Sequence, residues 1–165
     1  MWRRAERALL VAITVLGAAG CDQGTKHWAR EALAGGPREF FASRLQLTLA
    51  SNRGAFLSLG DGLPPRLRTI IFSVFVLVAL VAALTWVLRR GGRSRVETIA
   101  IALVVGGGFG NLLDRILRSG AVTDFIFLQL GPLHTGVFNV ADICITAGVV
   151  AVLFTQLRTR RELVK

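Results

Sequence analysis

Long apolar runs separated by shorter polar stretches dominate the hydropathy pattern of the chain. The clearest run, residues 69–88, holds twenty residues without a charge, which is the length of a helix that crosses a bilayer. A shorter uncharged run begins at residue 8 and becomes long enough for a second helix when the polar residues after it are included. The pattern predicts four transmembrane helices, over residues 8–25, 69–88, 98–115 and 137–157.

The two longer connections between these helices carry strand signals instead. Residues 26–66 contain no run of membrane length and form the predicted extracytoplasmic segment. Within it, leucines alternate with polar residues over 45–49, the period of a half-buried strand, and residues 55–59 are expected to pair back as a hairpin. Residues 121–136 read as a second short extended segment with a turn at Gly131-Pro132.

Composition agrees with a membrane protein. The 165 residues are 53% hydrophobic and only 18% charged, and the mean hydropathy of +0.57 is too high for an ordinary soluble domain. We therefore expect an all-α membrane protein, a single integral membrane domain over residues 1–165. It has four transmembrane helices, a small extracytoplasmic β-sheet between helices 1 and 2, and a short loop insertion between helices 3 and 4.

The net charge of +10 at first suggests a nucleic-acid partner. The basic residues cluster at the ends of apolar runs, however, which fits lipid headgroups and topology better. Lys and Arg are densest in the N-terminal segment, in the 89–95 loop and in the C-terminal tail. By the positive-inside rule these three segments are cytoplasmic.

The N-terminus has an alternative interpretation. A basic start, an apolar run and small residues ending at Cys21 resemble a lipoprotein signal peptide that would be cleaved off. Ala18 stands three residues before Cys21, where a bulky aliphatic residue is usual, and several more apolar runs follow in place of a soluble domain. We therefore favour a retained transmembrane helix.

Polar residues collect at the outer ends of the predicted helices, at one membrane level. Such groups are expensive in a membrane, so their default interpretation is functional. Asp22 and Lys26 are spaced i,i+4, as are Asn111 and Arg115, so each pair shares a helix face. Residues of this kind come from three of the four helices and from the last connection: Asp22, Lys26, Asn111, Asp114, Arg115, Asp124, Asn139 and Asp142.

Hydrogen bonds and ion pairs that only hold helices together would also explain such residues. This explanation stays open for Asp22 with Lys26 and for Asp114 with Arg115. It is weaker for Asp124 and Asp142, because no nearby position offers either one a basic partner. Two carboxyl groups in a partly dry site share a proton and can act together as base and acid.

Other chemistries find little material in the sequence. His27 and His134 are the only histidines and lie far apart, which disfavours a metal site or a Ser-His-Asp arrangement. The glycines within residues 106–110 lie in an apolar run, without the strand–loop–helix context of a phosphate site. They allow either close packing of helices or close approach of a substrate backbone, and the sequence does not separate the two.

Five blocks of residues carry a family resemblance along nearly the whole chain. They are DQGTK at 22–26, NRGAFLS at 52–58, GGGFGNLLDR at 106–115, VTDFI at 122–126 and FNVADICIT at 138–146. Together these blocks resemble the bacterial lipoprotein signal peptidases, also called signal peptidase II. The segment 51–57 departs from the usual family pattern, because Ser51 replaces an aromatic residue and Phe56-Leu57 replace an Ala-Phe pair.

The resemblance implies a multi-pass aspartyl endopeptidase of the bacterial inner membrane. It would remove signal peptides from diacylglyceryl-modified prolipoproteins by cutting just before the lipidated cysteine. It implies membrane lipids and the inhibitor globomycin as further partners, no metal or organic cofactor, no nucleic acid, and a monomer with its active site towards the outer leaflet. By position it implies Asp124 and Asp142 as catalytic dyad, Asn52, Gly54, Asn111, Arg115 and Asn139 as substrate-binding residues, and Asp22, Lys26 and Asp114 as supporting residues.

Two alternatives to this function remain at the level of sequence. In an ion-coupled membrane carrier the same carboxylates would relay ions, which predicts acids spread through the bilayer depth or an internal repeat. Neither is seen. A homologue that binds lipidated peptides without cleaving them is the other alternative, and the divergent segment 51–57 keeps it open.

Overall fold

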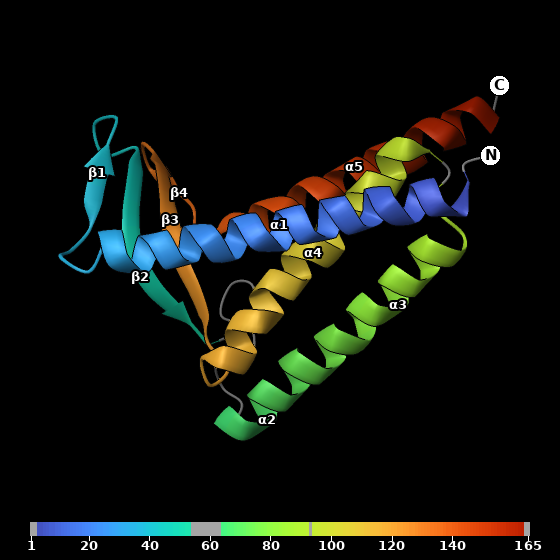
Figure 1. Ribbon diagram of the computed structural model, residues 1–165. Coiled ribbons are helices and arrows are strands. Elements are labelled where there is room, and N and C mark those ends of the chain that lie inside the picture. Colours follow the sequence, from blue (N-terminus) through green and yellow to red (C-terminus); the bar gives the residue numbers. More distant parts are fainter. Residues whose placement is uncertain (1–2, 54–63, 93, 164–165) are drawn as a thin grey trace.

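A computed structural model describes residues 3–53, 64–92 and 94–163 of the chain (Figure 1). Within them, three helices are long and apolar enough to cross a membrane: α1 (Arg4–Ala32), α4 (Arg95–Leu117) and α5, which runs from Val140 to Leu163. The described strands form one small antiparallel sheet at one end of these helices. The expected combination of membrane helices and a small sheet is confirmed.

The apolar run at 69–88 takes a less regular form than expected. Helix α2 (Pro65–Ile70), the π-helix η2 (Ile71–Phe75) and α3 (Val76–Arg89) follow one another without interruption. The wider π turn breaks the α-helical hydrogen bonding, so that α3 alone has 14 residues, fewer than a bilayer-crossing helix needs. Arg7 of α1 donates to the carbonyl oxygen of Leu88 at 2.7 Å and ties the end of α3 to the start of α1.

Helix α4 is the centre of the bundle, because it packs against α1, α3 and α5. Its glycines lie at these contacts. A Cβ atom added at Gly106 would stand 2.8 Å from Cβ of Ala18 in α1, and one added at Gly107 would stand 2.5 Å from the carbonyl oxygen of Ala141 in α5. Of the two uses that the sequence leaves open for these glycines, the structure shows close helix packing.

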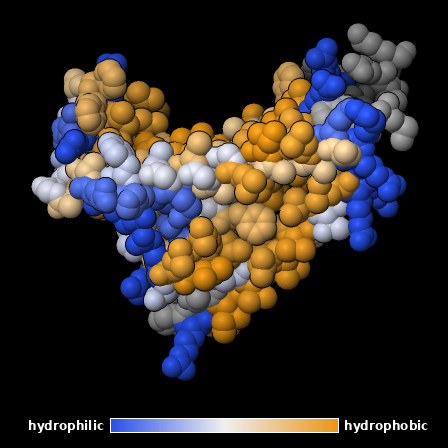
Figure 2. Space-filling view, viewed as in Figure 1, coloured by the Kyte–Doolittle hydropathy of each residue, from blue (hydrophilic) through white to orange (hydrophobic). Residues whose placement is uncertain are grey.

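The outward faces of α1, α3 and α5 are apolar. Exposed side chains there include Ile13, Leu16, Val78 and Phe154. Figure 2 shows this apolar surface over the helices, with hydrophilic residues gathered at the left, at the upper right and at the lower tip of the molecule. A large exposed apolar surface of this kind is the signature of contact with lipid.

The sheet joins two segments that are far apart in the sequence. Its strands are β1 (Arg38–Phe40), β2 (Leu45–Asn52), β3 (Val122–Leu130) and β4 (Leu133–His134), in that spatial order. The leucine-rich strand expected at 45–49 is present as part of β2. Its described partners are β1 and β3, whereas the expected partner, residues 55–59, lies outside the described residues.

The segment between the last two long helices is therefore part of the sheet and not a separate loop insertion. The expected turn at Gly131-Pro132 joins β3 to β4, with Gly131 at a φ of +62°. Strand β2 needs a hydrogen-bonding partner along its second edge, and β3 supplies it. This corrects the expectation of a sheet confined to the connection between helices 1 and 2.

Helix α1 continues seven residues beyond the expected end of the first span, from residue 26 to Ala32. This last part is buried: Ala29 and the following Leu33 pack with Phe125 of β3 in a small hydrophobic cluster. The end of α1 is thus held against the sheet, which places the polar residues of α1 beside β3.

Replacing Gly107 by alanine should destabilise the protein by about 1–3 kcal/mol, because the new methyl group meets the carbonyl oxygen of Ala141 at the crowded contact between α4 and α5. The melting temperature in detergent measures this effect. The matched control is Gly20→Ala in α1, where an added Cβ has no atom within 4 Å. The control should melt no lower than the wild type, since alanine favours helix. Equal melting temperatures for the two variants would contradict the packing described above.

Candidate active site

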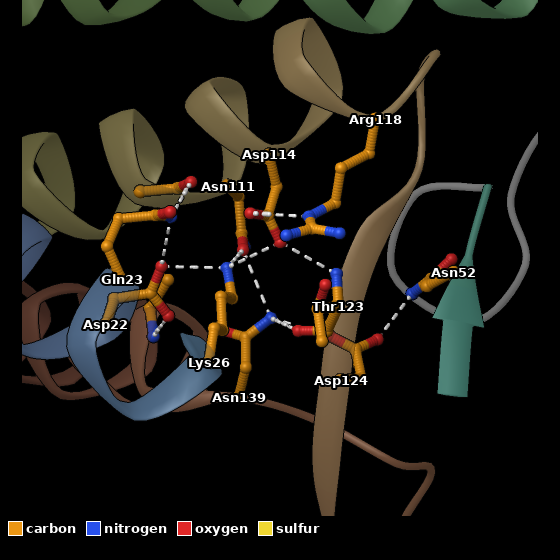
Figure 3. Close-up of polar contacts among 12 residues, drawn as sticks. Asp22, Gln23, Lys26, Asn52, Asn111, Asp114, Arg118, Thr123, Asp124 and Asn139 are labelled. Carbon is orange, nitrogen blue, oxygen red and sulfur yellow. Dashed lines mark hydrogen bonds and ion pairs between the residues drawn. The ribbon is translucent and has the colours of Figure 1, made fainter. Parts of the chain in front are cut away.

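Polar side chains from four elements converge where the sheet meets the helices (Figure 3). They come from α1, the second half of α4, the start of β3 and the start of α5, and a fifth element, β2, approaches with its last residue. Most of them are buried. The group consists of Asp22, Lys26, Asn52, Asn111, Asp114, Thr123, Asp124, Asn139 and Asp142.

The side chain of Lys26 has no exposed surface. Its Nζ lies 2.7 Å from Oδ2 of Asp22, 2.9 Å from Oδ1 of Asn111 and 3.4 Å from Oδ2 of Asp114. The ion pair expected from the i,i+4 spacing of Asp22 and Lys26 is therefore present. A buried ammonium group is stable only when it is fully partnered, and here the three oxygens provide that partnership.

The two carboxylates beside Lys26 also reach the elements that carry the expected dyad. The second oxygen of Asp22 accepts from the backbone N–H of Ala141 at 2.9 Å, in the first turn of α5. Oδ2 of Asp114 accepts from the backbone N–H of Thr123 at 2.8 Å, at the start of β3. Its Oδ1 lies 3.5 Å from Nε of Arg118. The buried carboxylate of Asp22 thus links α1 to α5, and that of Asp114 links α4 to β3.

Asn139 and Asp142 begin α5 with a reciprocal cap. Oδ1 of Asn139 accepts from the backbone N–H of Asp142 at 3.0 Å, and Oδ2 of Asp142 accepts from the backbone N–H of Asn139 at 3.2 Å. The pair satisfies two groups that a helix start otherwise leaves without partners, as in a capping box. The i,i+3 spacing of these residues in the sequence therefore serves the local fold as well as the site.

Asn139 and Asn111 connect the two carboxyl groups of the expected dyad. Nδ2 of Asn139 donates to Oδ1 of Asp124 at 2.5 Å, while its backbone N–H reaches Asp142. Nδ2 of Asn111 donates to Oδ1 of Asp142 at 2.9 Å. Asp124 and Asp142 therefore lie on the same small group of amides, close enough for the charge of one to act on the other.

The position of Asp124 depends on an irregularity in the sheet. The register of β2 against β3 shifts by one residue between Leu47 and Ala50, and Ala50 then pairs with Asp124. A bulge of this kind re-aims the side chains beyond it. On the edge of β3 away from β2, the backbone of Phe138 forms hydrogen bonds with that of Ile126 and holds Asn139 beside Asp124.

Burial raises the pKa of Asp124 to about 6, because the ionised carboxylate loses its hydration. The hydrogen bond from Asn52, at 3.1 Å, acts in the opposite direction, and the nearby charge of Asp142 raises the pKa further. A carboxyl group with its pKa near 6 can both take and give a proton around neutral pH, which is what general acid–base chemistry needs.

The structure brings together nearly all the residues singled out from the sequence. Arg115 is half-buried and lies within electrostatic range of Asp142 and Asp124. Gly54 lies outside the described residues. Sequence reasoning missed Thr123 and Arg118, which contact Asp114. The i,i+4 spacing of Asp114 and Arg118 could have predicted their contact, whereas no sequence pattern indicates the hydrogen bond from the backbone N–H of Thr123 to Asp114.

Comparison with known proteins now adds to this geometry. The family profile described as "Signal peptidase (SPase) II" matches residues 13–158. The chain belongs to the signal peptidase II family. That membership supports a protease and gives no support to a carrier or to a non-cleaving binder.

Relatives and solved structures agree with the family. The chain is 37% identical to the lipoprotein signal peptidase of Hydrogenovibrio crunogenus over 143 residues, covering 86% of this chain and 82% of the relative. It is 31% identical to that of Francisella tularensis subsp. novicida over 153 residues, covering 93% and 92%. A bacterial membrane enzyme solved at 2.3 Å by the in meso method is similar in fold, with a TM-score of 0.72, 25% identity and coverage of 93% and 88%. With its apolar helices, the family places the chain in a bacterial membrane as a multi-pass protein.

The pKa of Asp124 gives a test of the geometry at this site. Replacing Asn52 by leucine should raise that pKa above its value of about 6, because the hydrogen bond that favours the ionised carboxylate is lost. The ¹³C shift of the carboxyl carbon, followed against pH in detergent micelles and assigned with Asp124→Asn, measures it. The neighbouring exposed Ser51, changed to alanine, is the control and should leave the titration unchanged. An unchanged or lower pKa in Asn52→Leu would contradict the contact.

Proposed function

We propose that the chain is an aspartyl endopeptidase that removes the signal peptide from diacylglyceryl-modified prolipoproteins, cutting just before the lipidated cysteine. The observation that carries the proposal is the single residue Asn139, which donates to Asp124 and to Asp142. Two carboxyl groups are thereby brought together in a largely buried site at the end of an apolar bundle. Membership in the signal peptidase II family supports lipoprotein precursors as the substrate class.

In the proposed mechanism the two carboxyl groups share one proton, because both cannot easily be ionised side by side in a partly dry site. The ionised group takes a proton from a water molecule, whose oxygen then forms a bond to the carbonyl carbon of the scissile peptide. The protonated group donates to the carbonyl oxygen. When the C–N bond breaks, the carboxyl group that took the proton from water gives it to the leaving amine. A hydroxyl group of the tetrahedral intermediate returns its proton to the other carboxylate as the C=O bond re-forms, so that the dyad returns to its starting state.

Polar side chains around the dyad would replace the hydration that a substrate backbone loses on entering the site. Asn52 and Asn139 already donate to carboxylate oxygens there, and Asn111 does the same from α4. Arg115 adds a positive charge on the same side of α4. We assign these residues, together with Gly54, to substrate binding, and Asp22, Lys26 and Asp114 to their support.

Replacing Asp124 or Asp142 singly by asparagine should leave a folded protein that does not process a lipidated precursor, with a loss of at least about 10³-fold, since each variant removes one member of a unit. Purified protein is mixed with a diacylglyceryl-modified precursor and the shortened product is followed on a gel. Glu31→Gln, which neutralises an exposed acid near the C-terminal end of α1, is the control and should cleave normally. Normal turnover by either aspartate variant would refute the dyad.

We further propose a topology of four crossings, with α2, η2 and α3 together forming the second. Both termini and the 89–95 connection are cytoplasmic, and the sheet and dyad face the outer leaflet. Two observations support this. The start of α1, the end of α5 and the α3–α4 connection lie at the end of the bundle away from the sheet (Figure 1). That end also holds the dense basic segments, as the positive-inside rule requires.

Cysteine labelling tests this topology. In a background with alanine at Cys21 and Cys144, Ser43→Cys beside the sheet should react with a membrane-impermeant maleimide added to spheroplasts. Glu6→Cys, at the opposite end of α1, should react only after lysis. Both positions are exposed, so access to the reagent depends on the side of the membrane. Reaction of Glu6→Cys before lysis would contradict the proposed orientation.

A further inference from the structure

Lys26 is fully buried, yet the proposed reaction uses no lysine. An ion pair between α1 and α4 would need only Lys26 and the carboxylate of Asp114. The third oxygen at the ammonium group is different in kind, because it is the amide oxygen of Asn111, 2.9 Å from Nζ (Figure 3). The nitrogen of the same amide donates to Asp142 of the dyad.

An ammonium group donates hydrogen bonds and cannot accept them. The Asn111 amide must therefore turn its oxygen towards Lys26, which leaves its nitrogen to donate to Asp142 at 2.9 Å. In the reversed orientation its N–H groups would face an ammonium group and its carbonyl oxygen would face a carboxyl oxygen. Lys26 thus decides which end of the amide faces the dyad.

The same constraint passes on to Asn139. Oδ1 of Asn111 accepts a second hydrogen bond from Nδ2 of Asn139 at 3.1 Å, and that nitrogen also donates to Asp124. Oδ1 of Asn139 is taken by the backbone N–H of Asp142. Neither amide can reverse without losing its contacts, and the two amides together present donors to both carboxyl groups.

We propose that Lys26 is a positioning residue for the dyad: by fixing the orientation of the Asn111 amide, and through it that of Asn139, it keeps hydrogen-bond donors aimed at Asp124 and Asp142. This inference rests on the proposed function. It adds a role for a residue that does not touch the dyad.

Among the described residues, charged groups other than the dyad lie beside this chain of contacts, and one of them is Arg118, whose Nε lies 3.5 Å from Oδ1 of Asp114. Asp22 and Asp114 contact Lys26, and Arg115 lies within range of both members of the dyad. The ammonium group of Lys26 also acts at a distance on Asp124, where it lowers the pKa of the carboxyl group. Removing Lys26 should therefore let Asp124 hold its proton to higher pH.

The test compares two variants that both lose the ion pair between Lys26 and Asp22. Lys26→Met combined with Asp22→Asn removes one positive and one negative charge and keeps the length of the apolar stem. Asp22→Asn alone keeps Lys26 on Asn111. We expect the two to melt at similar temperatures in detergent. The double variant should have a kcat/KM about 10- to 100-fold lower than that of Asp22→Asn, the size of loss seen when a residue that orients a metal ligand is removed.

The pH profile separates positioning from a structural role. In the double variant the alkaline limb of kcat/KM should move to higher pH, because Lys26 no longer lowers the pKa of Asp124. If Lys26 only held the helices together, the two folded variants would share the same kcat/KM and the same profile, which would overturn the proposal.

A double-mutant cycle gives a second, independent test. Lys26→Gln should lower kcat/KM in the wild type but have little further effect in Asn111→Ala, where no amide remains to be oriented. Losses that multiply would overturn the proposal, and so would the failure of every Lys26 variant to fold, because folding would then be the role of the lysine. A wild-type protein that does not cleave the lipidated precursor would instead refute the proposed function, so the two failures remain distinct.

Discussion

The ammonium group of Lys26 has left water completely and has three protein oxygens from α1 and α4 in place of its hydration shell. Such a group tolerates little movement of its partners, because each lost contact leaves a charge or a dipole buried without compensation. The distance between α1 and α4 is therefore tightly set. Glycine makes that distance possible: an added Cβ at Gly110 would stand 2.5 Å from a carboxylate oxygen of Asp22. Packing and polar contacts here are two aspects of one constraint.

The same constraint extends to the two elements that carry the dyad. Asp22 bonds to the first turn of α5 and Asp114 to the first residues of β3, so each carboxylate beside Lys26 also fixes the backbone next to one catalytic candidate. Asn139 then serves twice, since it caps α5 and bridges the two carboxyl groups. A residue with both tasks couples the start of a helix to the geometry of the site.

Contacts between residues that are close in sequence could be predicted from the sequence, whereas contacts between distant segments could not. The pair Asp22–Lys26 follows from helical spacing alone and is present in the structure. The pairing of β2 with β3 was not predictable, because it joins segments about seventy residues apart, as the 72-residue separation of Asn52 and Asp124 shows. The register shift and the π turn were hidden for a related reason: local apolar patterns do not record a change in backbone hydrogen bonding.

The surroundings of the proposed dyad suggest a route by which a lipid-anchored substrate would meet it. Asp124 is almost completely buried, whereas Asp142 is only half-buried, so the peptide would approach from the side of Asp142. Close to that residue in α5, Ile143 is exposed, and the end of α4 exposes Ile116 and Leu117. Acyl chains can remain against this apolar surface in the bilayer while the adjoining peptide reaches the polar group. Cleavage next to a lipid anchor requires such a boundary, where a lipid-facing surface lies within a few residues of the carboxyl groups.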